Sequence, residues 1–206
     1  MECIFKCSAC KTRCDDKSKK VYNFKSDIKY SEEKEKYIIY QINSIPDFSA
    51  QKCTVDKYPD IEVTHKPTGK VFYIEIKAMR RTFMTVAKNL PDSDLIPSET
   101  LALNLSDLVR YFDIQKKTDK PVFIIWCLEN RPCIVSPGET FFCYQDVSVL
   151  KTIYEAEGDK RRFKRESGKG DVVNGKHLGV TVNYHFSIKE LIELDLEELL
   201  SKGAGL

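Results

Sequence analysis

Residues 58–79 place the strongest constraint on what this chain can fold into. They read YPDIEVTHKPTGKVFYIEIKAM, which is two short β-like runs on either side of a Pro-Thr-Gly sequence. Proline and glycine at these positions are typical of a turn, and runs rich in Val, Ile, Tyr and Phe are typical of strands. We therefore predict strands over residues 60–65 and 71–79, joined as a β-hairpin by a turn at residues 66–70.

The polar residues of this hairpin have a spacing that suits metal-dependent chemistry. Side chains alternate along a strand, so Glu75 and Lys77 share one face, and Asp60 begins the partner strand. If the two acidic faces lie side by side, Asp60, Glu75 and the carbonyl of Ile76 offer oxygen ligands for a hard cation such as Mg²⁺. A bound metal acidifies water and stabilises transition-state charge, and Lys77 can hold or deprotonate that water. The hairpin therefore predicts hydrolysis of a phosphodiester.

The same residues resemble a known motif. Pro59-Asp60 followed by Glu75-Ile76-Lys77 is similar to the signature of the PD-(D/E)XK nuclease superfamily, which has the restriction-endonuclease-like fold. The resemblance implies that the two acids bind Mg²⁺ or Mn²⁺ and that the lysine assists the nucleophilic water. It also implies a core of a helix, three strands, a helix and a fourth strand. Residues 31–128, about half of the chain, fit that order.

A first helix is predicted over residues 31–45. Ile38, Ile42 and Ile45 recur at the spacing of an amphipathic helix, and Pro46 ends it. In the superfamily a glutamate on this helix often supports the metal site. The resemblance therefore implies a supporting role for Glu35, which lies on the core-facing stripe.

Other polar residues on the two helices enter through the same resemblance. Glu32 and Glu33 are rivals of Glu35 on the first helix. Some members of the superfamily place a polar residue on the second helix near the site, and Gln115 is the candidate for that part. The resemblance does not extend to the N-terminal cysteines or to the last 75 or so residues of the chain.

The remaining elements are predicted from apolar patterns and turn signals. Residues 121–128, PVFIIWCL, form a continuous apolar run typical of a central strand buried on both faces. Ser187 and Glu190 have the spacing of a capping box. We further expect a strand over 52–56, a helix over 98–117, a hairpin over 133–144, a basic loop over 160–170, a strand over 178–186 and a helix over 187–200. This order predicts an α/β protein with a restriction-endonuclease-like mixed central sheet flanked by helices.

The first 20 residues are predicted to form a separate cysteine-rich module, ahead of a nuclease-like domain over 21–206 with a C-terminal β/α extension. Cys3, Cys7, Cys10 and Cys14 follow a C-x3-C-x2-C-x3-C pattern, and four thiolates suit a structural Zn²⁺. The spacing also fits one helical face, along which Cys3 and Cys14 would be about 16 Å apart. One Zn²⁺ therefore requires a looped backbone. An unligated cysteine face and an iron–sulfur cluster stay open as alternatives.

Two basic segments are candidates for nucleic-acid contact. Arg80 and Arg81 follow the catalytic strand, where they would emerge beside the scissile phosphate. The second segment has the densest positive charge and includes Phe163, which can stack on a base. Its basic residues are Lys160, Arg161, Arg162, Lys164 and Arg165. A solvated loop is the alternative interpretation of this second segment.

Composition narrows the class of protein. The chain has 206 residues, with 33 Lys and Arg against 31 Asp and Glu, so its net charge is only +2 and any basic surface must be local. No apolar run approaches the roughly 20 residues of a membrane span, and the first residues lack a signal-peptide core. We expect a cytoplasmic protein without membrane contact, in which cysteines serve as thiols or metal ligands.

These observations support one main hypothesis, a Mg²⁺-dependent nuclease acting on DNA, with RNA as the other possible substrate. One alternative is a catalytically inactive nuclease fold that serves as a zinc-containing adaptor for nucleic acid or protein. A second alternative is an interaction protein with no nucleic-acid role. The sequence leaves open endonuclease against exonuclease action, the recognition sequence and whether the chain forms a homodimer.

Overall fold

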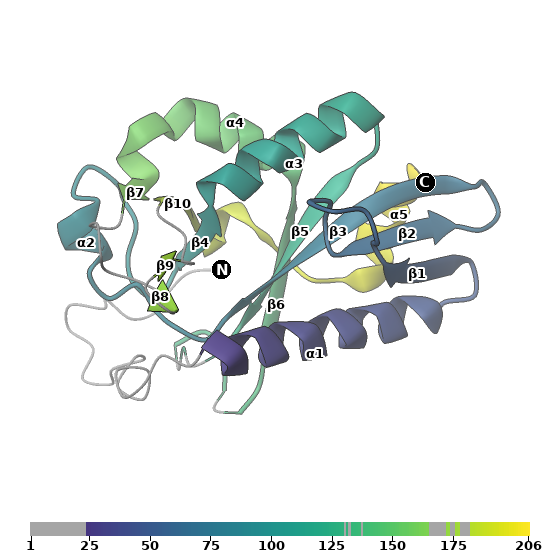
Figure 1. Cartoon of the computed structure of the whole chain (residues 1–206), viewed down its shortest axis with the longest axis horizontal. Coiled ribbons are helices and arrows are strands. Elements are labelled where there is room, and N and C mark those ends of the chain that lie inside the picture. The colour runs from purple at the N-terminus through teal and green to yellow at the C-terminus, as the bar shows by residue number, and fades with distance from the viewer. Residues whose placement is uncertain are drawn as a thin grey trace.

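The structure is a computed structural model that describes residues 24–129, 131, 133–136, 138–164, 172–173, 176–177 and 182–206 (Figure 1). The predicted cysteine module, with Cys3, Cys7, Cys10 and Cys14, lies outside the described residues, and so does Arg165. Within the described part of the chain, no helix is long and apolar enough to cross a membrane.

A mixed sheet forms the centre of the molecule. Its six strands among the described residues lie in the order β1-β2-β3-β5-β6-β11. Neighbouring strands are antiparallel except β3 and β5, which are parallel. The strands are β1 (Phe48–Lys52), β2 (Ile61–His65), β3 (Lys70–Met79), β5 (Val122–Leu128), β6 (Phe141–Asp146) and β11 (Ile192–Glu193). The predicted hairpin is therefore present as β2 and β3, and the prediction of a mixed central sheet is confirmed.

Helices cover both faces of this sheet. They are α1 (Phe24–Asn43), α3 (Leu105–Thr118), α4 (Val147–Glu157) and α5 (Leu196–Ala204). Figure 1 shows α1 below the sheet and α3 and α4 above it. Because β5 is covered on both sides, all seven of its residues are buried, as its continuous apolar sequence predicts. The order of α1, β1 to β3, α3 and β5 matches the helix, three strands, helix and strand that we expected, with a short helix and one further strand inserted between β3 and α3.

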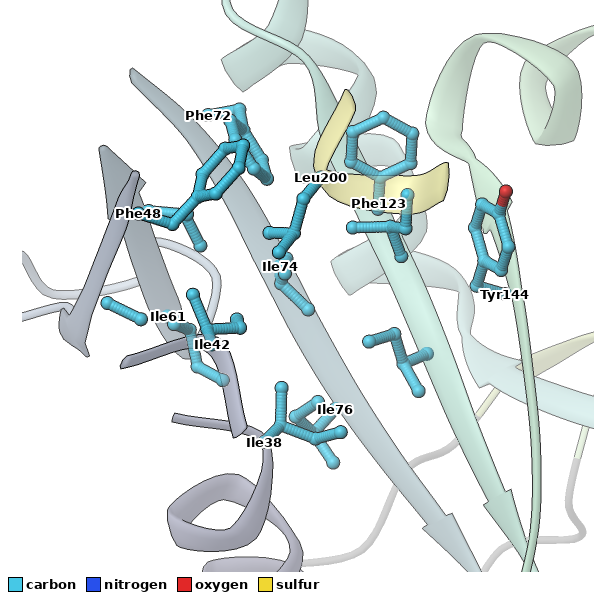
Figure 2. Packing of buried hydrophobic residues seen from close by; sticks show 14 of the residues in the cluster. Ile38, Ile42, Phe48, Ile61, Phe72, Ile74, Ile76, Phe123, Tyr144 and Leu200 are labelled. Atoms are coloured by element: carbon cyan, nitrogen blue, oxygen red, sulfur yellow. The ribbon is translucent and has the colours of Figure 1, made fainter. Parts of the chain in front are cut away.

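Strand alternation divides the core into two apolar clusters. Ile74 and Ile76 of β3 face α1 and α5, where they pack with Ile38, Ile42 and Leu200 (Figure 2). The recurrence of Ile38 and Ile42 on one helical face is thus explained by burial against the sheet, because an amphipathic helix is stabilised mainly by covering apolar surface. The opposite face of the sheet packs against α3 and α4.

A second, three-stranded sheet joins the cluster under α3. It has the order β4-β10-β7, with β4 (Thr100–Asn104), β7 (Arg162–Lys164) and β10 (Val182–Ser187). Leu101, Leu103, Tyr184 and Phe186 point from this sheet into the core. A short helix, α2 (Val86–Asn89), lies near it, and a further strand pair, β8 (Val172–Val173) with β9 (Lys176–His177), is also present.

Two element predictions near the site are wrong in part. The strand predicted over 52–56 is instead β1, because Phe48 and Ala50 supply its buried face and pair with β2. The helix predicted over 98–117 begins only at Leu105, since residues 100–104 form β4 and pair with β10 some 80 residues later. The Asn104 side chain accepts a hydrogen bond from Ser106 and caps α3. A distant partner strand thus overrides the local helical pattern.

The C-terminal predictions are corrected in the same way. The hairpin predicted over 133–144 is wrong, because the described residues from Cys133 to Thr140 form no strand and β6 pairs instead with β5. Part of the basic loop forms a 3₁₀ helix, η1 (Gly158–Arg161), and β7. The capping box of Ser187 and Glu190 is confirmed, but it begins a 3₁₀ helix, η2 (Ile188–Glu190), and not a long helix. Asp195 caps the separate helix α5, and α4 was not predicted.

Candidate active site

Two side-chain to backbone hydrogen bonds hold the carboxylates of Asp60 and Glu75 in place. Asp60 lies just before β2, and its Oδ2 atom accepts a hydrogen bond from the N–H of Ile76 at 2.9 Å. The Oε2 atom of Glu75 in turn accepts a hydrogen bond from the N–H of Asp60 at 3.2 Å. These bonds continue the pairing of β2 and β3 through side chains, one residue beyond the strand register. The two carboxylates are therefore held side by side at the end of the hairpin.

Lys77 completes the polar face of β3. Its ammonium group forms an ion pair with Oε1 of Glu75, and its side chain is 26% exposed. Burial lowers the pKa of Lys77, but the charge of Glu75 and the hydrogen bond to it act in the opposite direction and leave that pKa above its ordinary value. Lys77 is thus a cation here, so it is suited to holding water or a phosphate oxygen.

The ionisation of Asp60 is disfavoured by its surroundings. Burial and the charge of Glu75 raise the pKa of Asp60 to about 7, although the N–H of Ile76 and the charge of Lys77 oppose the shift. A hard divalent cation binds carboxylate oxygens, and its charge would offset the repulsion between these two buried or partly buried carboxylates. The pair therefore fits the metal that the motif implies.

Further ligands for such a metal must come from outside the acidic side chains. In the described part of the chain, no three His, Cys, Asp or Glu residues form a group that could hold a metal ion. Mg²⁺ is commonly bound by only one or two carboxylates, with water and substrate phosphates completing its coordination. The carbonyl of Ile76 stays a predicted ligand, because the observed bond to Asp60 uses only its N–H.

Glu35 approaches the site from α1 but is engaged by a cation. It is 8% exposed, whereas its rivals Glu32 and Glu33 are exposed. Its Oε2 atom lies 3.0 Å from Nζ of Lys52, at the end of β1. Glu35 is close enough to contribute to the raised pKa of Asp60, as the last of its causes. The sequence analysis did not identify Lys52 as a residue of the site. Its position depends on the pairing of β1 with β2, which places it opposite Ile61.

A tyrosine on α3 is a second residue that the sequence analysis missed. Tyr111 is buried, and its hydroxyl forms a hydrogen bond with Glu75. Burial, the charge of Glu75 and that bond all raise the pKa of Tyr111, so it is a neutral donor. Gln115, the predicted α3 residue, instead donates to Asp146 at 3.5 Å. Tyr111 and Gln115 are four positions apart and lie on the same face of α3. The sequence therefore identified the correct face of the helix, but the residue that reaches Glu75 lies one turn earlier.

The basic residues fall into exposed and engaged groups. Arg161 is 7% exposed, and its Nη1 atom lies 2.7 Å from both carboxylate oxygens of Glu190, which favours a structural role. Arg80 lies against the ring of Tyr30 and near Glu129. The residues of the second basic segment that are exposed are Lys160, Arg162 and Lys164. Arg81, on the chain that leaves β3, lines a pocket.

Comparisons with known proteins add a structural likeness. No protein-family model and no curated protein matches the chain. Among solved structures, the chain is similar to Hjc of Archaeoglobus fulgidus, a Holliday junction resolvase from an archaeal hyperthermophile. The identity is 10%, the alignment covers 82% of this chain and 94% of that chain, and the TM-score is 0.45. A likeness of this strength assigns neither a family nor a function, so the functional argument depends on the site.

Proposed function

We propose that this chain is a divalent-metal-dependent nuclease of the PD-(D/E)XK type that hydrolyses phosphodiester bonds in DNA. The observation that carries the proposal is the arrangement of Asp60, Glu75 and Lys77. Two adjacent carboxylates with a cation beside them provide a metal site and a positive group for the water or the phosphate. The match of the motif to its strands, and of those strands to the expected order of elements, also supports it.

Each residue of the site has a proposed role. Asp60 and Glu75, with the carbonyl of Ile76, bind Mg²⁺ or Mn²⁺, which when bound lowers the pKa of a water molecule and stabilises charge on the phosphate. Lys77 positions the attacking water and offsets phosphate charge. Glu35 supports the site from α1. Separation of Lys52 from Glu35 would free the Glu35 carboxylate for this role. Tyr111 holds the carboxylate of Glu75 in position.

DNA is proposed to approach along the basic residues near the end of β3. Arg80 and Arg81 come directly after that strand, and Lys160, Arg162 and Lys164 are the exposed residues of the second basic segment. Phosphate contacts of this kind supply affinity without sequence preference and weaken as salt rises. The cysteine module is proposed to hold a structural Zn²⁺, which a measurement of metal content in the purified chain would test.

The test is cleavage by the purified full-length chain. Labelled linear duplex, single-stranded and branched DNA and a matched RNA are incubated with Mg²⁺, Mn²⁺ or EDTA. We expect metal-dependent cleavage of DNA that Asp60→Asn removes. Glu62→Gln is the matched control, because Glu62 lies on β2, two residues after Asp60, and its side chain bonds only Gln51 in the described structure.

The outcomes separate the proposal from its alternatives. Cleavage that persists in Asp60→Asn at the wild-type rate would overturn the proposed site. DNA binding without cleavage under every metal condition would favour the inactive adaptor. A chain that neither binds nor cleaves nucleic acid would favour an interaction protein.

A further inference from the structure

A pocket of about 210 Å³ lies on the small sheet, on the face turned away from the core. Strand alternation creates it, because Tyr184 and Phe186 of β10 point into the core while Asn183 and His185 point to the other side. On β7, Phe163 pairs with Asn183 in the antiparallel register and lines the same pocket. Residues of the chain that follows β3, among them Thr82 and Phe83, also line it.

Three of the residues that line this pocket carry aromatic rings. The ring of Phe83 stacks on that of His185, with 4.9 Å between centroids and 28° between planes. Phe163 lies 5.3 Å from Phe83 and 6.4 Å from His185. Both phenylalanines are only partly buried, and both line the pocket. Such a wall favours a flat, aromatic ligand, since ring pairs gain energy beyond the area that they bury.

Polar groups are placed among these rings. Asn183 lines the pocket with an amide that offers a donor and an acceptor together. The Nδ1 atom of His185 donates to the carbonyl of Arg161 at 3.2 Å, and burial lowers the pKa of His185 to about 4. The ring is therefore neutral at pH 7, with Nε2 as an acceptor.

Thr82 adds an unsatisfied group to the same wall. It lines the pocket, is 8% exposed, and its hydroxyl has no hydrogen-bond partner among the described residues. A buried polar atom without a partner is costly and uncommon, so it is itself a reason to expect a ligand. Stacking surfaces combined with separate donors and acceptors match the edge and the faces of a nucleobase.

The pocket begins close to the candidate active site. Met79, one of its lining residues, lies two positions beyond Lys77 on β3. Residues two apart share a strand face and are about 7 Å apart. The Sδ atom of Met79 also accepts from the N–H of Ala102, which fixes the end of β3 to the small sheet. A nucleotide whose phosphate lies at Lys77 can therefore place a neighbouring base at this pocket.

We propose that the pocket formed by Thr82, Phe83, Phe163, Asn183 and His185 binds one unpaired nucleobase of the DNA on which the chain acts. The base stacks on the accessible phenylalanine rings, and its edge bonds Asn183. This proposal rests on the proposed nuclease function, which supplies the DNA. It adds a preference for DNA in which a base is free to leave the helix.

The test uses equilibrium binding of a labelled single-stranded oligonucleotide to the full-length chain in EDTA. A matched series of oligonucleotides lacks the base at one position at a time. Phe163→Ala and, as a milder change, Asn183→Leu are compared with wild type. Tyr40→Ala is the control, because Tyr40 is a well exposed aromatic residue on α1. Free nucleoside monophosphates form a second arm, which distinguishes a DNA base from a free nucleotide.

We expect about tenfold weaker binding in Phe163→Ala, as stacking of one base contributes that much affinity. One abasic position should weaken wild-type binding by a similar factor and should have no further effect on Phe163→Ala. Tyr40→Ala should bind as wild type does. Asn183→Leu, which leaves the aromatic wall intact, should also weaken binding and keep the wild-type melting temperature.

Each of the following results would overturn the proposed base-binding site. If wild type cleaves DNA but both pocket variants and all abasic oligonucleotides bind normally, the pocket proposal fails and the nuclease proposal survives. If the chain binds no oligonucleotide in EDTA, the pocket proposal fails, and the nuclease proposal fails with it only when cleavage in Mg²⁺ and Mn²⁺ is absent as well. If only free nucleotides bind, with loss in Phe163→Ala, a nucleotide site replaces the proposed base site.

Discussion

The Oδ2 atom of Asp60 accepts a hydrogen bond from the backbone N–H of Ile76 at 2.9 Å. This bond fixes the carboxylate of one strand of the hairpin against the backbone of the other. It also sets Asp60 beside Glu75, so that the charges of the two carboxylates oppose each other. The same contact that builds the site therefore stores an electrostatic cost when no cation is present.

Removal of this repulsion should stabilise the metal-free protein. Burial and Glu75 raise the pKa of Asp60 to about 7, so at pH 8 Asp60 is mostly ionised and its charge destabilises the folded state relative to the unfolded chain. Asp60→Asn should therefore raise the melting temperature in EDTA at pH 8 and abolish the further rise that Mg²⁺ gives to wild type. Scanning calorimetry with and without Mg²⁺ measures both. Glu62→Gln is the control, and a lower melting temperature for Asp60→Asn in EDTA would contradict the account.

Tyr111 should act through the position of Glu75. Tyr111→Phe removes the hydroxyl that bonds this carboxylate and leaves the ring in the core. Loss of a residue that orients a metal ligand typically costs about 10–100-fold in metal affinity or activity. We expect a loss of that size in Mn²⁺ affinity, measured by calorimetry. Tyr184→Phe removes a buried hydroxyl from the same cluster, and an equal loss there would show a general packing effect.

The two central arginines of the basic segment should differ in kind. Arg161 is buried and paired with Glu190, so Arg161→Ala should lower the free energy of unfolding by about 3 kcal/mol. Arg162 is exposed, and its pair with Asp159 is long, so Arg162→Ala should change stability by less than about 0.5 kcal/mol. Urea unfolding measures both. Equal stability of the two variants would show that Arg161 is not structural.

Stability should depend on the protonation of His185. Burial lowers its pKa in the folded state to about 4, below the ordinary value of 6.5. The unfolded chain therefore binds more protons between these values, and the contribution of this group to stability is present above pH 6.5 and is lost as pH falls toward 4. The loss should total about 3 kcal/mol. Urea unfolding from pH 7 to pH 4 should show this slope, and His185→Gln should reduce it. If His185→Gln showed the same dependence of stability on pH as wild type, the lowered pKa of His185 would be contradicted.

Gly203 should tolerate no side chain. A Cβ atom at this position in α5 would lie 2.7 Å from ring atoms of the fully buried Phe72. Gly203→Ala should destabilise the protein by about 1–3 kcal/mol, although alanine favours a helix. Ser201→Ala, in the same helix, is the control. In thermal unfolding, Phe72→Leu should reduce the effect of Gly203→Ala, and an additive double variant would contradict the clash.

The hairpin shows how much could be predicted. The strands that became β2 and β3, their turn and the common face of Glu75 and Lys77 all follow from local alternation. The Ile38 and Ile42 stripe located α1 and left Glu35 as the most buried acid of its turn.

The failures share a physical cause. Residues 100–104 looked helical together with those that follow, but they pair with β10, and strand pairing depends on a partner far along the chain. Tyr111 and Lys52 were missed for the same reason. A tyrosine on a helix and a lysine at a strand end carry no signal until packing sets them beside Glu75 and Glu35.

The sequence by itself determined the hairpin, the buried strand β5 and the residue types of the candidate site, because periodicity and turn chemistry act over a few neighbouring residues. Only the tertiary structure decided which groups meet: Asp60 with Ile76, Glu35 with Lys52, Arg161 with Glu190. These contacts depend on how sheets and helices pack across the whole chain. The charge, protonation and accessibility of the site therefore follow from the fold and not from the motif.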